Sequence, residues 1–377
     1  MKHLEKNNEL IRLKDGWFQL EKDQEALELF MEEVVEKTIK FGSLIQHIDY
    51  LIENKYYPNI FEKYLPTQVE SIYNELVGHE FKFQSYTSAT KFYNSYALKT
   101  FDKKYYLEDY NLRVLSVALY LAQGDFNKAR EFAISMITGC YQPATPTFSN
   151  SGKYRAGELV SCFILSMDDT LNSIFHTNTV AAQLSRLGGG VGIDLSYLRG
   201  RGAKIRDVEG VAKGVVPVMK ELETTFTYAD QLGTRKGSGV GYLNIFHYDV
   251  EELIASRGIN VAEEARLKSI SIGLVIPSLF FTLAAKKRDL VLIEPKSFFD
   301  EYGYHFADME FNIEFYDEVI ANPNVMTKKA TVNPREMLVR IAVSHLESGY
   351  PYLMFKDNVN KVHPLSGIGD VKISNLC

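Results

Sequence analysis

Two cysteines far apart in the chain are the residues with the clearest chemical potential. Cys162 lies in a short apolar run beside Ser161, and Cys377 follows Ser374-Asn375-Leu376. A cysteine in an apolar strand is usually a small buried hydrophobe, and that explanation suffices for Cys140. Small hydroxyls near Cys162, on Ser161 and on the polar loop at Thr145, are instead typical of a substrate pocket. We therefore expect a buried strand at Cys162 and one site that contains Cys162 and Cys377.

The surroundings of these thiols narrow their chemistry. No His/Asn arrangement has the spacing of a hydrolytic cysteine nucleophile, and no Cys-x-x-Cys or paired histidines indicate a metal site. Three cysteines in 377 residues do not form a disulfide framework. Isolated thiols without a base or a metal indicate redox or radical chemistry.

Composition excludes several classes of protein. The chain is 46% hydrophobic with a net charge of −6, which gives no reason to expect nonspecific nucleic-acid binding. It has no run of eighteen apolar residues and no apolar signal-peptide core near Met1, so we expect no membrane span. The few cysteines are typical of a reducing compartment, and we expect the cytoplasm.

Glycine clusters suggest nucleotide binding without matching a standard motif. Gly188–Gly190 follows a predicted helix and precedes a predicted strand, the reverse of the dinucleotide-binding order. Two loops, 198–206 and 232–239, are both glycine-rich and basic, and free amides with Arg and Lys suit phosphate oxygens. Solvated mobile loops explain them equally well. Asp169 is either the N-cap of the helix from Leu171 or an acceptor for a ribose hydroxyl.

The first 140 residues read as helices that form a packing and docking domain. Asp23 is the predicted cap of a helix with one apolar face, and Thr67-Gln68-Val69-Glu70 is a predicted capping box. A third helix is predicted to stop at Gly124, and a fourth runs from about Phe126 to Gly139.

Strands and helices alternate after Cys140, which predicts an α/β fold with mostly parallel strands. Pattern alone allows either an open sheet or a closed barrel. The predicted strands are Val160–Leu165, Val191–Leu195, Leu274–Leu283, Leu290–Ile293 and, more weakly, Tyr352–Phe355 and Val371–Ser374. The predicted helices are Leu171–Leu187, Val211–Leu232, Val250–Ser256 and Pro334–Ser348.

Five motifs, in order along the chain, resemble the large subunit of class I ribonucleotide reductases, nearest to class Ib. These motifs are Gln142-Pro143-Ala144-Thr145-Pro146-Thr147-Phe148, Gly157-Glu158-Leu159-Val160-Ser161-Cys162-Phe163, Gly188-Gly189-Gly190-Val191, Gly214-Val215-Val216-Pro217-Val218-Met219-Lys220 and Ser374-Asn375-Leu376-Cys377. The short lead before Thr145 leaves little room for the additional N-terminal nucleotide module of other class I subunits. That favours class Ib.

The resemblance implies an all-helical N-terminal domain followed by a ten-stranded α/β barrel that is incomplete here. We expect a class Ib-type helical region at 1–85, an all-alpha domain at 86–158 and the N-terminal part of the catalytic barrel at 159–377.

The resemblance also implies roles for individual residues in the reduction of ribonucleoside diphosphates at the 2′-carbon. Cys377 matches the cysteine that becomes a thiyl radical and removes hydrogen from the 3′-carbon. Cys162 matches the cysteine that donates reducing equivalents and ends in a disulfide. Asn375 matches the asparagine that hydrogen-bonds the ribose. The other matched substrate contacts are Thr145, Ser161, Gly190 and Leu376.

Regulation and partners follow from the same resemblance. Asp169 and Arg199 match contacts to the (d)NTP effector that selects the substrate base, and the loops from Arg199 and around Thr234–Gly239 match the two specificity loops. No covalently bound cofactor and no metal are expected in this chain, because a metal-containing small (beta) subunit supplies the radical. The other expected partners are a thioredoxin- or glutaredoxin-like reductant and a second copy of the chain in a homodimer. We expect binding to neither nucleic acid nor a membrane.

The family continues beyond the cysteine matched by Cys377. The glutamate two residues on, the cysteine that pairs with Cys162 and the radical-relay tyrosines have no counterpart here. We expect an N-terminal fragment that works only with the C-terminal remainder of the large subunit. Alternatives are an effector-binding or dimerisation module without catalysis, an inactive truncated product, and an incomplete barrel that does not fold stably.

Overall fold

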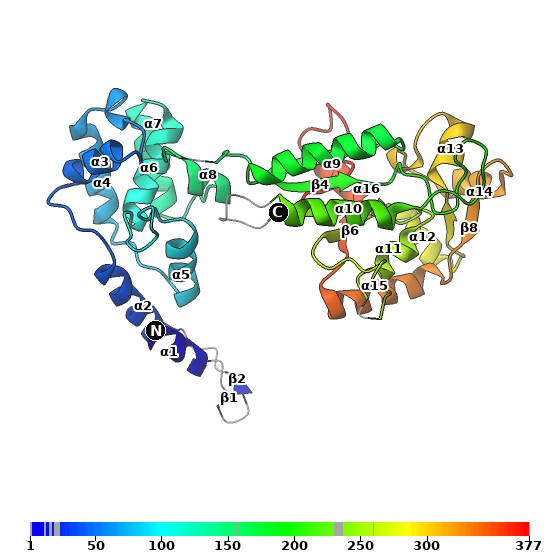
Figure 1. Ribbon diagram of the computed structural model, residues 1–377, viewed down its shortest axis with the longest axis horizontal. Coiled ribbons are helices and arrows are strands. Elements are labelled where there is room, and N and C mark those ends of the chain that lie inside the picture. Colours follow the sequence, from blue (N-terminus) through cyan, green and yellow to red (C-terminus); the bar gives the residue numbers. More distant parts are fainter. Residues whose placement is uncertain are drawn as a thin grey trace. The chain divides into compact units, whose positions relative to one another are not determined.

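In the computed structural model the chain forms two compact units, Met1–Val160 and Ser161–Cys377 (Figure 1). It describes residues 2–10, 13–14, 17–18, 23–155, 157–229, 237–258 and 260–376. No helix among these residues has the length and apolar character needed to span a bilayer.

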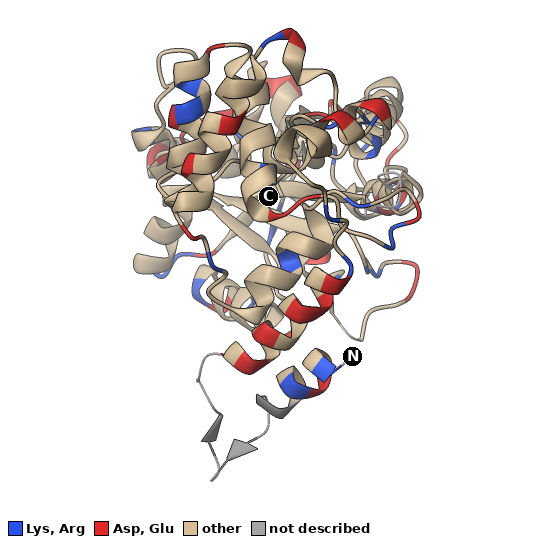
Figure 2. Cartoon of the chain, turned by 90° about the vertical axis from the view of Figure 1, so that its left-hand side faces the viewer, with Lys and Arg blue, Asp and Glu red and all other residues tan. Residues whose placement is uncertain are grey.

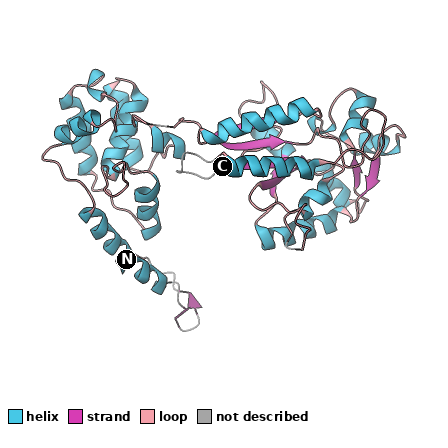
Figure 3. Cartoon of the chain, in the orientation of Figure 1, coloured by secondary structure: helices cyan, strands magenta, loops and turns pink. Residues whose placement is uncertain are grey.

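The N-terminal unit is built from helices (Figure 3), as predicted. Its only described strands, β1 (Leu13–Lys14) and β2 (Trp17–Phe18), form a two-residue antiparallel pair. Acidic residues, coloured red in Figure 2, recur along the helix α2 (Gln24–Glu36). The helices are α1 (Lys2–Leu10), α2 (Gln24–Glu36), α3 (Leu44–Glu53), η1 (Ile60–Glu62), α4 (Pro66–Gly78), α5 (Tyr86–Ser95), α6 (Tyr110–Ala122), α7 (Phe126–Ile137) and α8 (Thr145–Asn150).

Helix α6 is the centre of this unit, and its nearly continuous burial explains its apolar sequence. It ends as predicted, because Gln123 and Gly124 both take positive φ angles. The fully buried Arg113 guanidinium pairs with Glu108 at 3.0 Å and also donates to the backbone oxygen of Ser151. That contact ties the core to the end of α8, the short helix that begins at Thr145.

Two predicted helix caps are wrong. Asp23 occupies the N-cap position of α2, but its carboxylate accepts from the backbone N–H of Tyr86 instead of capping its own helix. Helix α4 starts at Pro66, so the residue that closes its first turn is Gln68, whose side chain accepts from the N–H of Leu65. Long-range packing replaced the local bond in the first case, and proline at the first turn moved the start in the second.

The second unit alternates strands and helices. Its elements are β3 (Cys162–Ser166), α9 (Leu171–Arg186), β4 (Gly190–Asp194), α10 (Val215–Tyr228), β5 (Ser238–Asn244), α11 (Val250–Ala255), β6 (Ser271–Ile276), α12 (Ser278–Ala285), β7 (Val291–Ile293), α13 (Pro295–Tyr302), η2 (Phe306–Asp308), α14 (Ile313–Ala321), β8 (Thr327–Lys329), α15 (Pro334–Ser348), β9 (Tyr352–Phe355) and α16 (Lys356–Val362).

Five of these strands form one all-parallel sheet in the order β3-β4-β5-β6-β9, while β7 and β8 pair separately in antiparallel fashion. The sheet and its covering helices confirm the predicted partial parallel α/β barrel. One face carries Val191, Ile193, Leu243 and Leu274 into the main core under the helices. The opposite face, here called the inner face, carries Val240, Tyr242, Val275 and Met354, which pack against Ile373 near the end of the chain.

Several predicted strands differ from the structure. The run Leu274–Leu283 is strand only to Ile276, after which Pro277 turns the chain into α12. Val371–Ser374 forms no strand, although Ile373 is buried. Strand β5 was missed because its glycines resemble a loop. A Cβ on Gly241 would lie 2.2 Å from the sulfur of Met219, so these glycines allow α10 to approach the sheet.

Candidate active site

The pairing of β3 with β4 places two predicted site residues side by side. Cys162 lies opposite Gly190 in the parallel register, and the backbone N–H of Gly190 donates to the oxygen of Ser161 at 2.6 Å. Leu165, three residues after Cys162, packs toward the helices, so alternation puts the Cys162 thiol on the inner face. The strand is not buried as predicted, because Cys162 is exposed and only Ser161 beside it is buried.

Asn375 is docked onto this strand pair. Its side-chain Nδ2 donates to the backbone oxygen of Phe163 at 2.6 Å and to that of Gly190 at 2.8 Å. Gly190 is the residue paired with Cys162, so the structure brings Cys162, Gly190 and Asn375 into one neighbourhood across more than 200 residues of sequence. Leu376 packs against the inner-face cluster next to them.

The segment 371–376 reaches this position by crossing the inner face of β4. Ser374 and Asn375 lie against Gly192, where a Cβ would be only 2.6 Å from the backbone oxygen of Ser374. Asn375 then bonds to Gly190, two residues nearer the start of the strand. Glycine at position 192 is required because the segment's backbone occupies the space of a side chain.

The other predicted substrate contacts do not all belong to the same unit of the chain. Ser161 lies next to the thiol, with its hydroxyl oxygen 3.8 Å from the Cys162 sulfur. Thr145 belongs to the N-terminal unit, where it begins α8 and its hydroxyl lies 3.1 Å from that of Tyr96. Cys377 lies outside the described residues, so its expected meeting with Cys162 stays a prediction.

Asp169 and Arg199, the two predicted effector contacts, form an ion pair. Asp169 accepts from both the backbone N–H and the Nε of Arg199, at 3.0 and 2.7 Å, and the guanidinium also donates to the oxygen of Lys204 at 2.6 Å. Asp169 does not cap α9, because Thr170 holds that position and accepts from Ser173. Its carboxylate is instead used to hold the start of the loop 199–214.

The first three amides of this loop are each held by a different carboxylate. Arg199 donates to Asp169, as described above. Of the next two residues in the chain, Gly200 donates its N–H to Glu294 at 3.1 Å, and Arg201 donates its N–H to Asp249 at 2.9 Å. Asp249 also accepts from Val215 at the first turn of α10, so one buried carboxylate joins both ends of the loop. The amides of residues 199–201 are therefore not free for a phosphate, which was one of the two explanations that the sequence allowed for the loop 198–206.

Asp249, Glu294 and His247 are functional candidates that sequence reasoning missed. The fully buried His247 accepts from the N–H of Asp249 at Nδ1, while Nε2 lies 2.8 Å from the oxygen of Leu198. A carbonyl oxygen only accepts, so Nε2 carries the proton, and burial lowers the pKa of His247 despite the nearby Asp249. No spacing signal could reveal contacts that span 48 to 94 residues.

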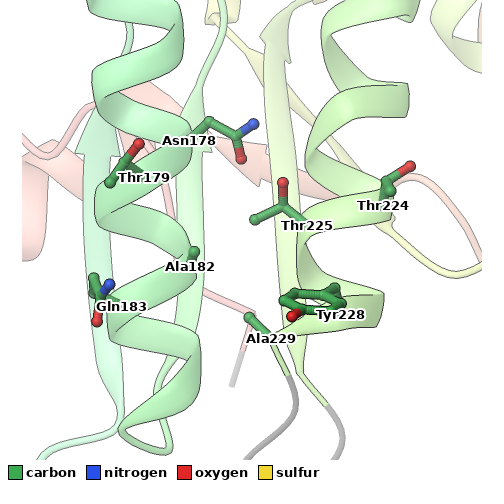
Figure 4. Close-up of a pocket in the computed structure, with 8 residues that line it drawn as sticks. All are labelled: Asn178, Thr179, Ala182, Gln183, Thr224, Thr225, Tyr228 and Ala229. Atoms are coloured by element: carbon green, nitrogen blue, oxygen red, sulfur yellow. The ribbon is translucent and has the colours of Figure 1, made fainter.

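The second predicted specificity loop, around Thr234–Gly239, is described only in part. Its residues 234–236 are outside the described part of the chain, and Ser238 and Gly239 begin β5. A pocket between α9 and α10 is lined by Asn178, Gln183, Thr224 and Tyr228, among others (Figure 4). Both helices pack on the face of the sheet opposite the inner face, so this pocket is not the candidate active site.

Comparison with known families accounts for this arrangement. Residues 160–377 match the family described as ribonucleotide reductase, barrel domain. The chain belongs to the ribonucleotide reductase family. Residues 3–81 match the ribonucleotide reductase N-terminal family, and residues 82–156 match the ribonucleotide reductase all-alpha domain.

The curated relatives that the chain matches are alpha subunits of ribonucleoside-diphosphate reductases. The chain is 47% identical over 378 residues to the ribonucleoside-diphosphate reductase subunit alpha of Bacillus subtilis, covering all of this chain and 54% of that protein. It is 48% identical over 373 residues to the nrdEB subunit alpha of Bacillus phage SPbeta, covering 98% of this chain and 34% of the relative. The Mycoplasma pneumoniae subunit alpha is 41% identical over 359 residues, which cover 94% and 49% of the two chains. The chain thus spans about a third to a half of these relatives.

Proposed function

We propose that this chain supplies the effector loop and about half of the active site of a class Ib-type ribonucleoside-diphosphate reductase large subunit. The observation that carries the proposal is the docking of Asn375 on the strand pair that presents Cys162. Family membership alone would allow these residues to be scattered. Their convergence on one face of a parallel half-barrel supports a shared chemical role.

In the proposed reaction, a thiyl radical on Cys377 removes the hydrogen from the 3′-carbon of the ribose. The 2′-hydroxyl then leaves as water, and Cys162 with a second thiol donates two electrons and the protons. These two thiols end as a disulfide. Cys377, which carries the abstracted hydrogen as a thiol, returns it to the 3′-carbon and becomes a thiyl radical again. Asn375 orients the ribose, while Thr145, Ser161, Gly190 and Leu376 contact the substrate.

The second thiol belongs to the part of the relatives' length that this chain does not span. The sheet supports a continuation, because β9 is an edge strand among the described strands. Helix α15, which precedes β9 in the chain, and the residues from the end of α16 onward also expose large apolar side chains, which a neighbouring layer would cover. These side chains are Val339, Val343, Leu346, Val362, Leu365 and Ile368.

The partners in this proposal are a ribonucleoside diphosphate, a radical-generating small subunit with its own metal, and a thioredoxin- or glutaredoxin-like reductant that reopens the disulfide. A second copy of the chain is a further partner. The exposed Leu171 and Phe175 on α9 and Tyr228 on α10 provide apolar area for that contact.

Reconstitution tests the proposal. The chain is mixed with the matching remainder of the Bacillus subtilis alpha subunit and a radical-bearing small subunit, and deoxynucleoside diphosphate formation is measured. Activity is expected in the mixture, is lost with Cys162→Ser, and is kept with Cys140→Ser as the matched control. An inactive mixture beside an active full-length alpha subunit would refute the complementation.

A second candidate function is effector binding without catalysis, and the Asp169–Arg199 pair favours it. An effector that contacts this pair must compete with contacts at 2.7 Å, so Arg199 exchanges one partner for another. Equilibrium dialysis of deoxynucleoside triphosphates against this chain alone should show binding that Arg199→Ala weakens. Arg130→Ala, which removes an ion-paired arginine in the N-terminal unit, should leave binding unchanged.

A further inference from the structure

A polar cluster lies where the segment 371–376 begins to cross the inner face. The Nζ of Lys372 donates to the hydroxyl of Tyr197 at 2.6 Å and to the carboxylate of Asp308 at 2.8 Å. The Tyr197 hydroxyl in turn donates to the same carboxylate oxygen at 2.7 Å. Three segments of the chain, the turn after β4, η2 and the segment 371–376, are thereby joined in one closed triangle of bonds.

The two groups that accept from Lys372, the Tyr197 hydroxyl and the Asp308 carboxylate, are fixed by further contacts. The Tyr197 ring is buried and stacks on His305 with the ring centres 3.9 Å apart, and His305 stacks on Phe299 at 4.6 Å. The buried Lys356 donates to the oxygen of Ala307 at 2.8 Å, which fixes the turn that carries Asp308. Lys372 therefore meets a rigid surface, and its bonds locate the segment that bears it.

Charge favours this set of bonds over alternatives. Burial and the adjacent Asp308 carboxylate raise the pKa of Tyr197, so its hydroxyl keeps the proton that it donates. Asp194, at the end of β4, is buried on the same side, and burial raises its pKa. Lys372 brings the positive charge that these acidic groups attract.

The segment has two side-chain anchors that lie three residues apart. Lys372 bonds to Tyr197, which follows the C-terminal end of β4, whereas the Asn375 side chain bonds to Gly190 at the N-terminal end. Between them the backbone crosses Gly192, against which Ser374 and the Cα of Asn375 lie. Three residues reach at most about 11 Å, so the position of Lys372 limits how far Asn375 reaches along β4.

We propose that Lys372 is a positioning residue, which sets the register of the segment 371–376 on β4 through Tyr197 and Asp308 and so places Asn375. This role deepens the proposed reductase function and rests on it for its catalytic consequence. The Lys372 and Asp308 side chains are 43% and 34% exposed, and such pairs contribute little to global stability. Loss of the Lys372 contact should therefore alter the position of Asn375 without changing the free energy of unfolding of the chain.

The structural test uses this chain alone. The side-chain amide protons of Asn375 are observed by NMR and assigned by their loss in Asn375→Asp, and their exchange with water is measured. Lys372→Met should accelerate exchange about three- to tenfold, as expected when a bond network of this kind is lost. Lys372→Arg, which keeps a donor and a charge, should restore most of the protection.

The controls separate register from general loosening. Lys361→Met removes an exposed lysine on α16 and should leave Asn375 unchanged. Combining Lys372→Met with Asp308→Asn should add little to the first change, because both remove the same contact. Unchanged exchange in Lys372→Met, or equal acceleration by Lys361→Met, would overturn the inference.

The kinetic test uses the reconstituted reductase. Lys372→Met should lower kcat about three- to tenfold with little change in the effector concentration that gives half activation, because the reacting ribose loses its orientation. Lys372→Arg should stay near the parent value. Undiminished kcat in Lys372→Met would contradict the positioning role, whereas an inactive parent mixture would instead count against the proposed function.

Discussion

Replacing Gly192 by Ala adds one methyl group at the point where the segment 371–376 crosses β4. The new Cβ would lie 2.6 Å from the backbone oxygen of Ser374 and 3.3 Å from the Cα of Asn375. Both neighbours are backbone atoms, so no side-chain rotation relieves the contact. Overpacking of this kind costs about 1–3 kcal/mol.

The segment can avoid that cost only by leaving β4. It would then lose the two hydrogen bonds from Asn375, at 2.6 and 2.8 Å, which contribute about 0.5–1.5 kcal/mol each. Keeping the overpacked contact and releasing the segment from β4 have similar free-energy costs. Gly192→Ala should therefore weaken docking of the segment by about 1–3 kcal/mol and displace Asn375.

The assay compares Gly192→Ala with Gly369→Ala, where an added Cβ meets no atom within 4 Å. Denaturant unfolding of the chain should show a loss of about 1–3 kcal/mol for the first variant and less than about 0.5 kcal/mol for the second. Reductase activity of the reconstituted mixture should fall only with the first. Equal stability and activity in the two variants would refute the docked geometry.

Three other predictions concern charge and loop structure. Burial raises the pKa of Glu223 but the N–H groups of residues 268–270 lower it overall, so its stabilisation is present above the ordinary value of 4.5 and is lost as the pH falls through its lower folded value. In thermal unfolding experiments, lowering the pH should therefore reduce the melting temperature of the parent protein more than that of Glu223→Gln. Burial lowers the pKa of Lys153 from 10.5 to about 8, so stability should rise by roughly 2–3 kcal/mol between these pH values, and Lys153→Met should abolish the rise. Asp249→Asn should cost about 2 kcal/mol in denaturant unfolding, because the amide keeps one acceptor oxygen and turns an N–H donor toward the N–H of Arg201 or Val215. An exposed control, Asp317→Asn, should stay within about 0.5 kcal/mol.

Local patterns predicted the elements whose sequence and packing agree. Helix α15, Pro334–Ser348, matches its prediction because proline and the Asn333 cap define its start and Gly349 its end. Strand β9 was also predicted correctly from its branched and aromatic residues. Strand β5 was missed because glycine there serves the close approach of α10, a tertiary requirement that propensity does not register.

The candidate site was predictable only where a motif identified it. Ser374-Asn375-Leu376 indicated its residues, but nothing local revealed that Asn375 would bond across β3 and β4. Asp169 illustrates the opposite error, because its position before α9 favours a cap while Arg199, thirty residues away, takes its carboxylate. Charge pairs at that separation depend on the assembled fold and leave no periodic signal in the sequence.

The most direct measurement of the central claim is a thiol crosslink in the Cys140→Ser variant. A short bifunctional thiol reagent is added, and the digested chain is searched by mass spectrometry for joined peptides. We expect a linkage between Cys162 and Cys377 within one chain, and Gly192→Ala should lower the yield of this linkage. If both thiols are modified separately and no intramolecular linkage forms, the two cysteines do not share a site.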